Sequence, residues 1–220
     1  MKTLPEQLLK KPFSTEEAVA QGISKTALTR MVKAGALERS SWGVYEVSDA
    51  VRDGRGLGDG SGFGMGSSSG AGHGDGSGGI EYSEQEKMYI VATLRCGTPS
   101  AICLLSALEH YHVTDEITKQ VWALVPASKR VISKDLKLVR SRNPQWNVGI
   151  LKTKDYWITT IERSLVDCLL HRRLVGYQVS LAALKQALAQ KKVKLGQVYD
   201  VANSLGVAHR IRPIIEALGS

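Results

Sequence analysis

A glycine-rich segment at residues 54–79 is the feature that most constrains how this chain can fold. It holds 13 of the 22 glycines of the 220-residue chain, and they alternate with serine, aspartate and single apolar residues. So little apolar surface cannot offset the conformational entropy lost on ordering the segment. The sequence therefore predicts three parts: a small domain over residues 1–53, a glycine-rich linker over 54–80 and a larger domain over 81–220.

The small domain carries the signals of short helices followed by a β-hairpin. Ser14-Thr-Glu-Glu17 has the sequence of a helix-starting capping box, and Ser24 can cap a further helix over Lys25–Ala34. Leu37–Val47 reads as two strands around a tight turn. This order of helix, short glycine turn, helix and hairpin predicts a winged helix-turn-helix.

The helix over Lys25–Ala34 has two chemically distinct faces. Leu28 and Met31 lie on one face, whereas the opposite face carries two threonines, an arginine and a lysine at helical spacing. In helix-turn-helix proteins such a face enters the major groove, where an arginine can donate two hydrogen bonds to guanine. The residues that we expect to contact double-stranded DNA, including the hairpin turn, are Ser24, Lys25, Thr26, Thr29, Arg30, Lys33, Arg39, Ser40, Ser41 and Trp42. The alternative is a protein-docking surface, which the near-neutral charge of residues 1–53 favours.

Positive charge is concentrated in the larger domain. The chain has a net charge of +8, and residues 81–220 carry 20 Lys and Arg against 12 Asp and Glu. Between 129 and 154 the only acid is Asp135, and the predicted basic patch consists of Lys129, Arg130, Lys134, Lys137, Arg140, Arg142, Lys152 and Lys154. Such a patch favours a polyanionic partner, either DNA phosphates or RNA, over a merely solvated basic face.

The hydrophobic periodicity of the larger domain predicts strands in the middle and helices at both ends. We expect helices over 83–95, 100–112 and 161–172, strands over 119–125, 136–141, 147–151 and 156–160, and three further helices over 181–190, 195–205 and 211–218. Segregated strands and helices indicate an α+β fold rather than a doubly wound parallel sheet.

The sequence offers only incomplete enzymatic or metal-binding motifs. His110-x-His112 and Cys168-x-x-His171 supply too few ligands for a zinc site, and Asp135-Leu-Lys137 has no second acid placed beside it for a metal-dependent nuclease. A G-x-G-x-x-G match at Gly74–Gly79 follows no strand and lies within the predicted linker. We therefore expect no catalytic residue, no metal and no cofactor.

The expected location is the cytoplasm, with no membrane partner. The apolar runs fall short of the roughly 20 residues that a membrane span needs, and no apolar stretch of a signal peptide follows Met1. Three cysteines form no disulfide framework, which is typical of a reduced cytoplasmic protein.

Several segments resemble the AbiEi-type antitoxins. They are Phe13–Arg39 and Trp42–Tyr45 in the small domain, and Pro99–Glu116, Val121–Pro126, Ile158–Leu169 and Arg210–Glu216 in the larger one. The resemblance implies a regulator of a type IV toxin–antitoxin system, whose winged helix binds inverted repeats in its own promoter and represses its operon. It also implies that the C-terminal domain counteracts a nucleotidyltransferase toxin. A nuclease-like enzyme targeted by a winged helix and a protein-interaction adaptor stay as alternatives.

Overall fold

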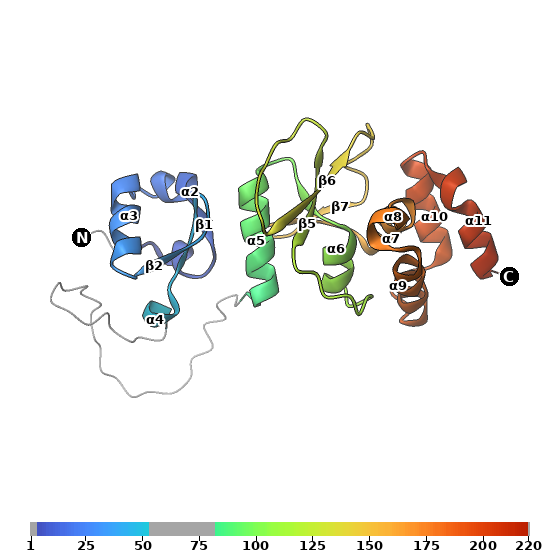
Figure 1. The fold of residues 1–220 in the computed structure, drawn as a ribbon, viewed down its shortest axis with the longest axis horizontal. Coiled ribbons are helices and arrows are strands. Elements are labelled where there is room, and N and C mark those ends of the chain that lie inside the picture. Colours follow the sequence, from blue (N-terminus) through green and yellow to red (C-terminus); the bar gives the residue numbers. More distant parts are fainter. Residues whose placement is uncertain (1–3, 53–81, 220) are drawn as a thin grey trace. The chain divides into compact units, whose positions relative to one another are not determined.

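The computed structural model describes residues 4–52 and 82–219, so the predicted glycine-rich linker lies outside the described residues (Figure 1). Contacts within the chain divide it into two compact units, with the boundary between Lys87 and Met88. Each unit is described by itself. Together they contain helices, an antiparallel sheet and a mixed sheet, which confirms the α+β prediction.

Residues 4–52 of the N-terminal unit form four helices and three short strands. In chain order they are α1 (Glu6–Leu9), β1 (Phe13–Ser14), α2 (Thr15–Ala20), α3 (Lys25–Lys33), β2 (Leu37–Ser41), β3 (Val44–Val47) and α4 (Asp49–Arg52). The predicted capping box is present: the Glu17 amide donates to the Ser14 hydroxyl, and the Ser14 amide donates to the Glu17 carboxylate. The predicted hairpin is present as β2 and β3.

A three-stranded antiparallel sheet closes the core of this unit, in the order β1-β3-β2. Strand β1 is an addition that the sequence analysis did not predict, and it pairs Phe13 with Tyr45. The side chains of Phe13, Leu28 and Leu37 are fully buried in one hydrophobic cluster, so the helices and the sheet share a single core. The arrangement is compatible with a winged helix-turn-helix.

The C-terminal unit contains a five-stranded sheet and a group of helices that follows it in the chain. Its elements are α5 (Glu84–Cys96), β4 (Ala101–Ile102), α6 (Leu104–His110), β5 (Val121–Pro126), β6 (Leu136–Ser141), β7 (Ile150–Lys152), β8 (Trp157–Thr159), α7 (Ile161–Leu170), α8 (Arg172–Val175), α9 (Tyr177–Ala189), α10 (Leu195–Ser204) and α11 (Ala208–Gly219). Although α5 begins just before the boundary at Lys87, it packs mainly in this unit, as shown below.

The strand order β6-β5-β4-β8-β7 makes the sheet mixed. Strands β5 and β6 are parallel, as are β4 and β8, whereas the β4–β5 and β7–β8 pairs are antiparallel. Strand β4 is only two residues long yet lies at the centre, where Ile102 pairs with Ala123 on one side and Ile158 on the other. The sheet therefore has β6 and β7 as its two edges.

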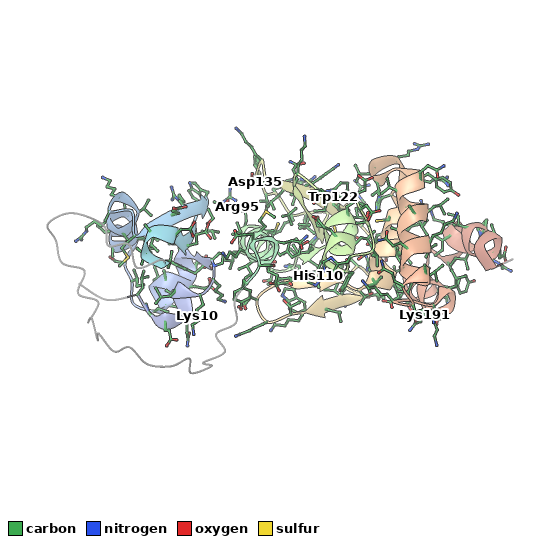
Figure 2. The ribbon with its side chains drawn as sticks, turned by 90° about the horizontal axis from the view of Figure 1, so that it is seen from below. Lys10, Arg95, His110, Trp122, Asp135 and Lys191 are labelled. Atoms are coloured by element: carbon green, nitrogen blue, oxygen red, sulfur yellow. The ribbon has the colours of Figure 1, made fainter. Side chains whose placement is uncertain are left out.

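Helices cover both faces of this sheet (Figure 1). On one face, Ala123 and Val125 of β5 form a cluster with Cys96 at the end of α5. On the other face, Trp122 and Leu124 join the main hydrophobic core together with α6, α7 and the C-terminal helices. Figure 2 shows Trp122 among these packed side chains. Successive side chains of β5 thus point to opposite faces of the sheet, and both sets are buried, as in a strand that is covered on both sides.

Several predicted elements differ from those observed. The helices predicted over 181–190 and 211–218 begin earlier, at Tyr177 and Ala208, and helices α4 and α8 were not predicted. The helix predicted over 100–112 is wrong in its first part, because Ala101–Ile102 form β4 and the helix begins only at Leu104. A continuous buried apolar run does not distinguish strand from helix by its period, and here pairing with two neighbouring strands decides. The strand predicted over 147–151 begins only at Ile150, because a turn ending at Gly149 precedes it.

Candidate nucleic-acid interface

Helix α3 is held at the surface of the N-terminal unit by one buried face. Leu28 and Met31 are buried in the core, and the Ser24 hydroxyl accepts a hydrogen bond from the Ala27 amide at the start of the helix. Gly22, with φ +79°, makes the tight turn between α2 and α3, a backbone conformation that glycine adopts without strain. The orientation of α3 thus follows from local sequence and core packing.

The opposite face of α3 is open to solvent. The exposed residues are Ser24, Lys25, Thr26, Thr29, Arg30 and Lys33. The Thr29 hydroxyl donates to the Lys25 carbonyl at 3.0 Å, so its proton is engaged within the helix. No acidic residue lies on α3, so its exposed face is cationic and offers hydrogen-bond donors. This is the geometry that readout in the major groove requires.

The β2–β3 hairpin presents the second group of predicted contact residues. Trp42 lies at its turn with 74% of its surface exposed, and Gly43 has φ +78° beside it. The Thr15 hydroxyl donates to the Gly43 carbonyl at 3.1 Å, which ties the turn to the start of α2. Arg39 is exposed and lies 5.6 Å from the centre of the Tyr45 ring. The hairpin turn is therefore held against the start of α2 while Trp42 protrudes into solvent.

Ser40 and Ser41 are less available than the other hairpin residues. Both are half-buried, and the Ser40 hydroxyl donates to the Glu46 carboxylate at 2.5 Å. The Ser40 oxygen can still accept a hydrogen bond, but its proton is engaged. Arg39 and Trp42 are thus the hairpin residues best placed for an external partner.

The basic patch predicted over 129–154 is divided between two edges of the C-terminal sheet. Lys137 and Arg140 belong to edge strand β6, whereas Lys152 belongs to β7 at the opposite edge, and Lys154 follows it. The residues near β6 are Lys129, Arg130, Lys134, Lys137, Arg140 and Arg142. Adjacency in sequence therefore does not make these eight residues one surface.

Several of these cations also have partners within the protein. The Lys137 ammonium lies 3.9 Å from the centre of the Trp122 ring, and Lys152 lies 5.6 Å from that of Trp157. The Lys129 ammonium donates to the Thr98 carbonyl at 3.1 Å, and Arg130 donates to the Ala127 carbonyl at 2.8 Å. Such contacts orient the side chains while leaving their charge in place.

The incomplete metal and enzymatic motifs gain no further ligand in the structure. Within residues 4–52 and 82–219, no three His, Cys, Asp or Glu side chains are grouped so that they could hold a metal ion. The predicted placement of both His110 and His112 on one helix is wrong, because α6 ends at His110 and His112 follows with φ +54°. Burial raises the pKa of the Cys168 thiol well above its usual range, which disfavours the thiolate that a metal or a nucleophilic role needs.

Over residues 4–52 and 82–219, no helix is both long and apolar enough to cross a bilayer.

The sequence of the N-terminal unit is similar to a known protein family. Residues 6–48 match the AbiEi antitoxin family of transcriptional regulators. The matched residues run from α1 through α3 and past the end of the β2–β3 hairpin, so they include every residue that we predict to contact DNA. The resemblance stated from the sequence is confirmed over this part of the chain. A comparison with curated proteins gives no match.

The family match bears on the N-terminal unit only. It is a likeness of residues 6–48 to a family described as transcriptional regulators and AbiEi antitoxins. The basic patch and the helices of the C-terminal unit lie outside the matched residues.

Proposed function

We propose that this protein is a DNA-binding transcriptional autorepressor and an antitoxin that counteracts a nucleotidyltransferase toxin. The observation that carries the first half is the exposed, acid-free face of α3, which lies within the residues matched by the regulator family. Inverted repeats in its own promoter are the expected operator. We further propose that the protein acts by binding, without catalysing a reaction.

The proposed DNA contacts have different roles. Arg30 lies in the middle of the exposed face and has the planar donor geometry that pairs with guanine. Lys33, one turn further along α3, is a point charge suited to a phosphate. Trp42 and Arg39 on the hairpin would contact the DNA backbone or the minor groove, as the wing of a winged helix does.

The operator contacts can be tested by measuring binding of the full chain to its own promoter fragment at several salt concentrations. Arg30→Ala should weaken binding by about 1–3 kcal/mol, or roughly 5- to 150-fold, and relax the preference at one base pair. Lys33→Ala should weaken binding to DNA of any sequence by a similar factor. It should also reduce the slope of log binding constant against log salt concentration by about one unit. Lys10→Ala is the charge-matched control, because Lys10 is paired with Glu6 on α1 at 2.8 Å.

The outcome separates the proposal from its two alternatives. An Arg30→Ala, Lys33→Ala double variant that binds the promoter as tightly as the wild type would show that α3 is not the recognition helix and would favour the adaptor. Metal-dependent cleavage of plain plasmid DNA by the purified protein would favour the nuclease-like enzyme instead.

The antitoxin half of the proposal is assigned to the C-terminal unit. Residues 81–220 carry the whole positive excess of the chain, so this unit is suited to phosphate contacts with the operator or to the RNA on which a nucleotidyltransferase would act. If the two activities are separate, the Arg30→Ala, Lys33→Ala variant should lose repression of its promoter but still restore growth to cells that express the toxin.

A further inference from the structure

A cavity in the C-terminal unit has a lining that neither the family match nor the proposed DNA contacts explain. It has a volume of about 290 Å³ and lies between the end of β6, the end of α7 and the start of α11. The elements around it are connected: the Asn143 side-chain amide, just after β6, donates to the Leu205 carbonyl at the end of α10 at 2.9 Å. The cavity is thus part of the folded unit.

The floor of the cavity is electrically compensated. Arg163 of α7 is 2% exposed and donates to the Asp167 carboxylate at 2.8 Å. Its guanidinium also donates to the carbonyls of Trp146 and Val148, so this arginine is fixed by the protein itself. The Arg163–Asp167 pair therefore contributes little net charge toward a ligand.

The rim of the cavity is not compensated. Arg140, Arg142 and Arg210 line it and are exposed, and none of the three forms an ion pair with a described residue. His171, exposed at the end of α7, lines it as well. Three arginines around one small concavity focus positive potential into it, which favours an anion.

Helix α11 adds to this preference. Val207, just before the helix, and Arg210, in its first turn, line the cavity, and that turn carries no acidic residue. The first amides of a 12-residue helix have no acceptor within the helix and favour a nearby anion, although the Arg210 amide already donates to the Val207 carbonyl at 3.0 Å. The start of α11 and the three arginines therefore both favour the binding of an anion in the cavity.

The size and chemistry of the lining indicate which anion fits. Arginine forms paired hydrogen bonds with phosphate, and three of them suit a group with several phosphate oxygens. The volume is at the lower end of the roughly 300–1,000 Å³ of small-ligand sites. The residues described as lining it include no Phe, Tyr or Trp, and the exposed His171 imidazole is the one aromatic ring among them. A phosphate end therefore fits better than a nucleobase.

We propose that this cavity, bounded by Arg140, Arg142 and Arg210, is a binding site for the terminal phosphate groups of a nucleotide. The nucleotide is either free or the phosphorylated end of a single-stranded RNA, and both present the same group. The site is independent of operator recognition by α3, so its test does not depend on the proposed repressor function.

The test measures binding to the full chain by calorimetry at constant ionic strength, with four probes. These are tripolyphosphate, ATP, a short single-stranded RNA with a 5′-phosphate, and the same RNA without it. We expect saturable binding of tripolyphosphate, displaced by whichever of ATP or the 5′-phosphorylated RNA is the better ligand. Loss of the 5′-phosphate should weaken RNA binding if the strand end is the ligand, and ATP should bind more tightly than either RNA if the free nucleotide is.

Arg142→Ala and Arg210→Ala should each weaken binding of the preferred probe by about tenfold or more, because each removes a charge-assisted contact. The charge-matched controls are the single variants Lys119→Ala and Lys185→Ala, each of which removes one exposed cation that does not line the cavity. Unchanged melting temperatures and circular dichroism spectra of both variants would show that they are folded. No saturable binding of any probe, or equal weakening by the control variants, would overturn the proposal, as would displacement of tripolyphosphate by duplex DNA alone.

Discussion

Arg163 shows how a single charged residue can organise a fold that its sequence position does not reveal. Its guanidinium joins Asp167 on its own helix to the carbonyls of Trp146 and Val148 in the turn before β7. Burial raises the pKa of the Asp167 carboxyl above its usual value, and the charge of Arg163 opposes that rise. Removing Arg163 would leave buried acceptors without a donor, which is costly.

The closeness of this turn to Arg163 leads to a prediction at two glycines. Gly149 has φ +69°, and a Cβ there would lie 2.7 Å from the Cβ of Arg163, whereas Gly206 has φ +71° and open space around it. Gly206→Ala should lower the free energy of unfolding by about 1–2 kcal/mol from backbone strain alone. Gly149→Ala should lower the free energy of unfolding by about 1–3 kcal/mol more than Gly206→Ala, because the added methyl group would overlap the Arg163 side chain. Urea unfolding of both variants measures the difference, and equal losses would show that the turn yields freely.

At the scale of elements, the N-terminal unit was the more predictable of the two. Ser14, Ser24 and Gly22 act within one turn of their own positions, so capping and turn preferences locate α2 and α3 from sequence alone. Strand β1 was missed because two residues, Phe13 and Ser14, are too short for a periodicity and exist as a strand only through pairing with β3.

The C-terminal unit was less predictable because long-range pairing fixes its key elements. Ala101 and Ile102 have the composition of a buried helix, yet they form the central strand between β5 and β8. The same limit applies to the candidate sites. The α3 face follows from helical spacing, but Arg142 and Arg210 lie on the same cavity only through folding, and no local sequence signal links them.

The reciprocal hydrogen bonds of the capping box predict a coupled effect on α2. Ser14→Ala removes the acceptor of the Glu17 amide, at 3.1 Å, and Glu17→Ala removes the acceptor of the Ser14 amide, at 2.7 Å. Each should destabilise the start of α2 by about 1 kcal/mol, and the double variant by less than the sum, because both bonds hold the same turn. Amide hydrogen exchange in α2 measures this. The control Glu16→Ala replaces an exposed residue of the same turn and should change the opening free energy measured by exchange by less than about 0.5 kcal/mol. If the effects of the Ser14 and Glu17 variants were strictly additive, the two hydrogen bonds would act independently.

At the scale of the whole molecule, charge and recognition are divided between the two units. Residues 1–53 carry 8 basic and 7 acidic residues, so the predicted recognition helix belongs to an almost neutral unit. Sequence-specific DNA recognition by such a unit would come from a few base contacts, such as that proposed for Arg30. The C-terminal unit holds the positive charge that favours binding of any polyanion. Under the proposed function, the protein would bind its operator with the N-terminal unit and act on RNA with the C-terminal unit.

This division leads to the prediction that residues 81–220 fold alone and restore growth to cells that express the toxin, whereas residues 1–53 do not. The C-terminal unit has its own sheet, covered on both faces, and its own hydrophobic core, which are what independent folding requires. Circular dichroism and a cooperative melting transition of the truncated protein check folding before any growth assay.

The cations near β6 should then determine whether rescue occurs. Replacing Lys129, Arg130, Lys137, Arg140 and Arg142 with alanine should leave the truncated protein folded but unable to restore growth, because it removes the charge that attracts RNA. A control with equal charge loss replaces the exposed residues Lys119, Arg172, Arg173, Lys185 and Lys191 and should still restore growth. Equal rescue by both variants would show that total charge and the β6 edge are irrelevant to the antidote. In that case the helices outside the basic patch would carry the activity, and contact with a protein partner would replace RNA as its basis.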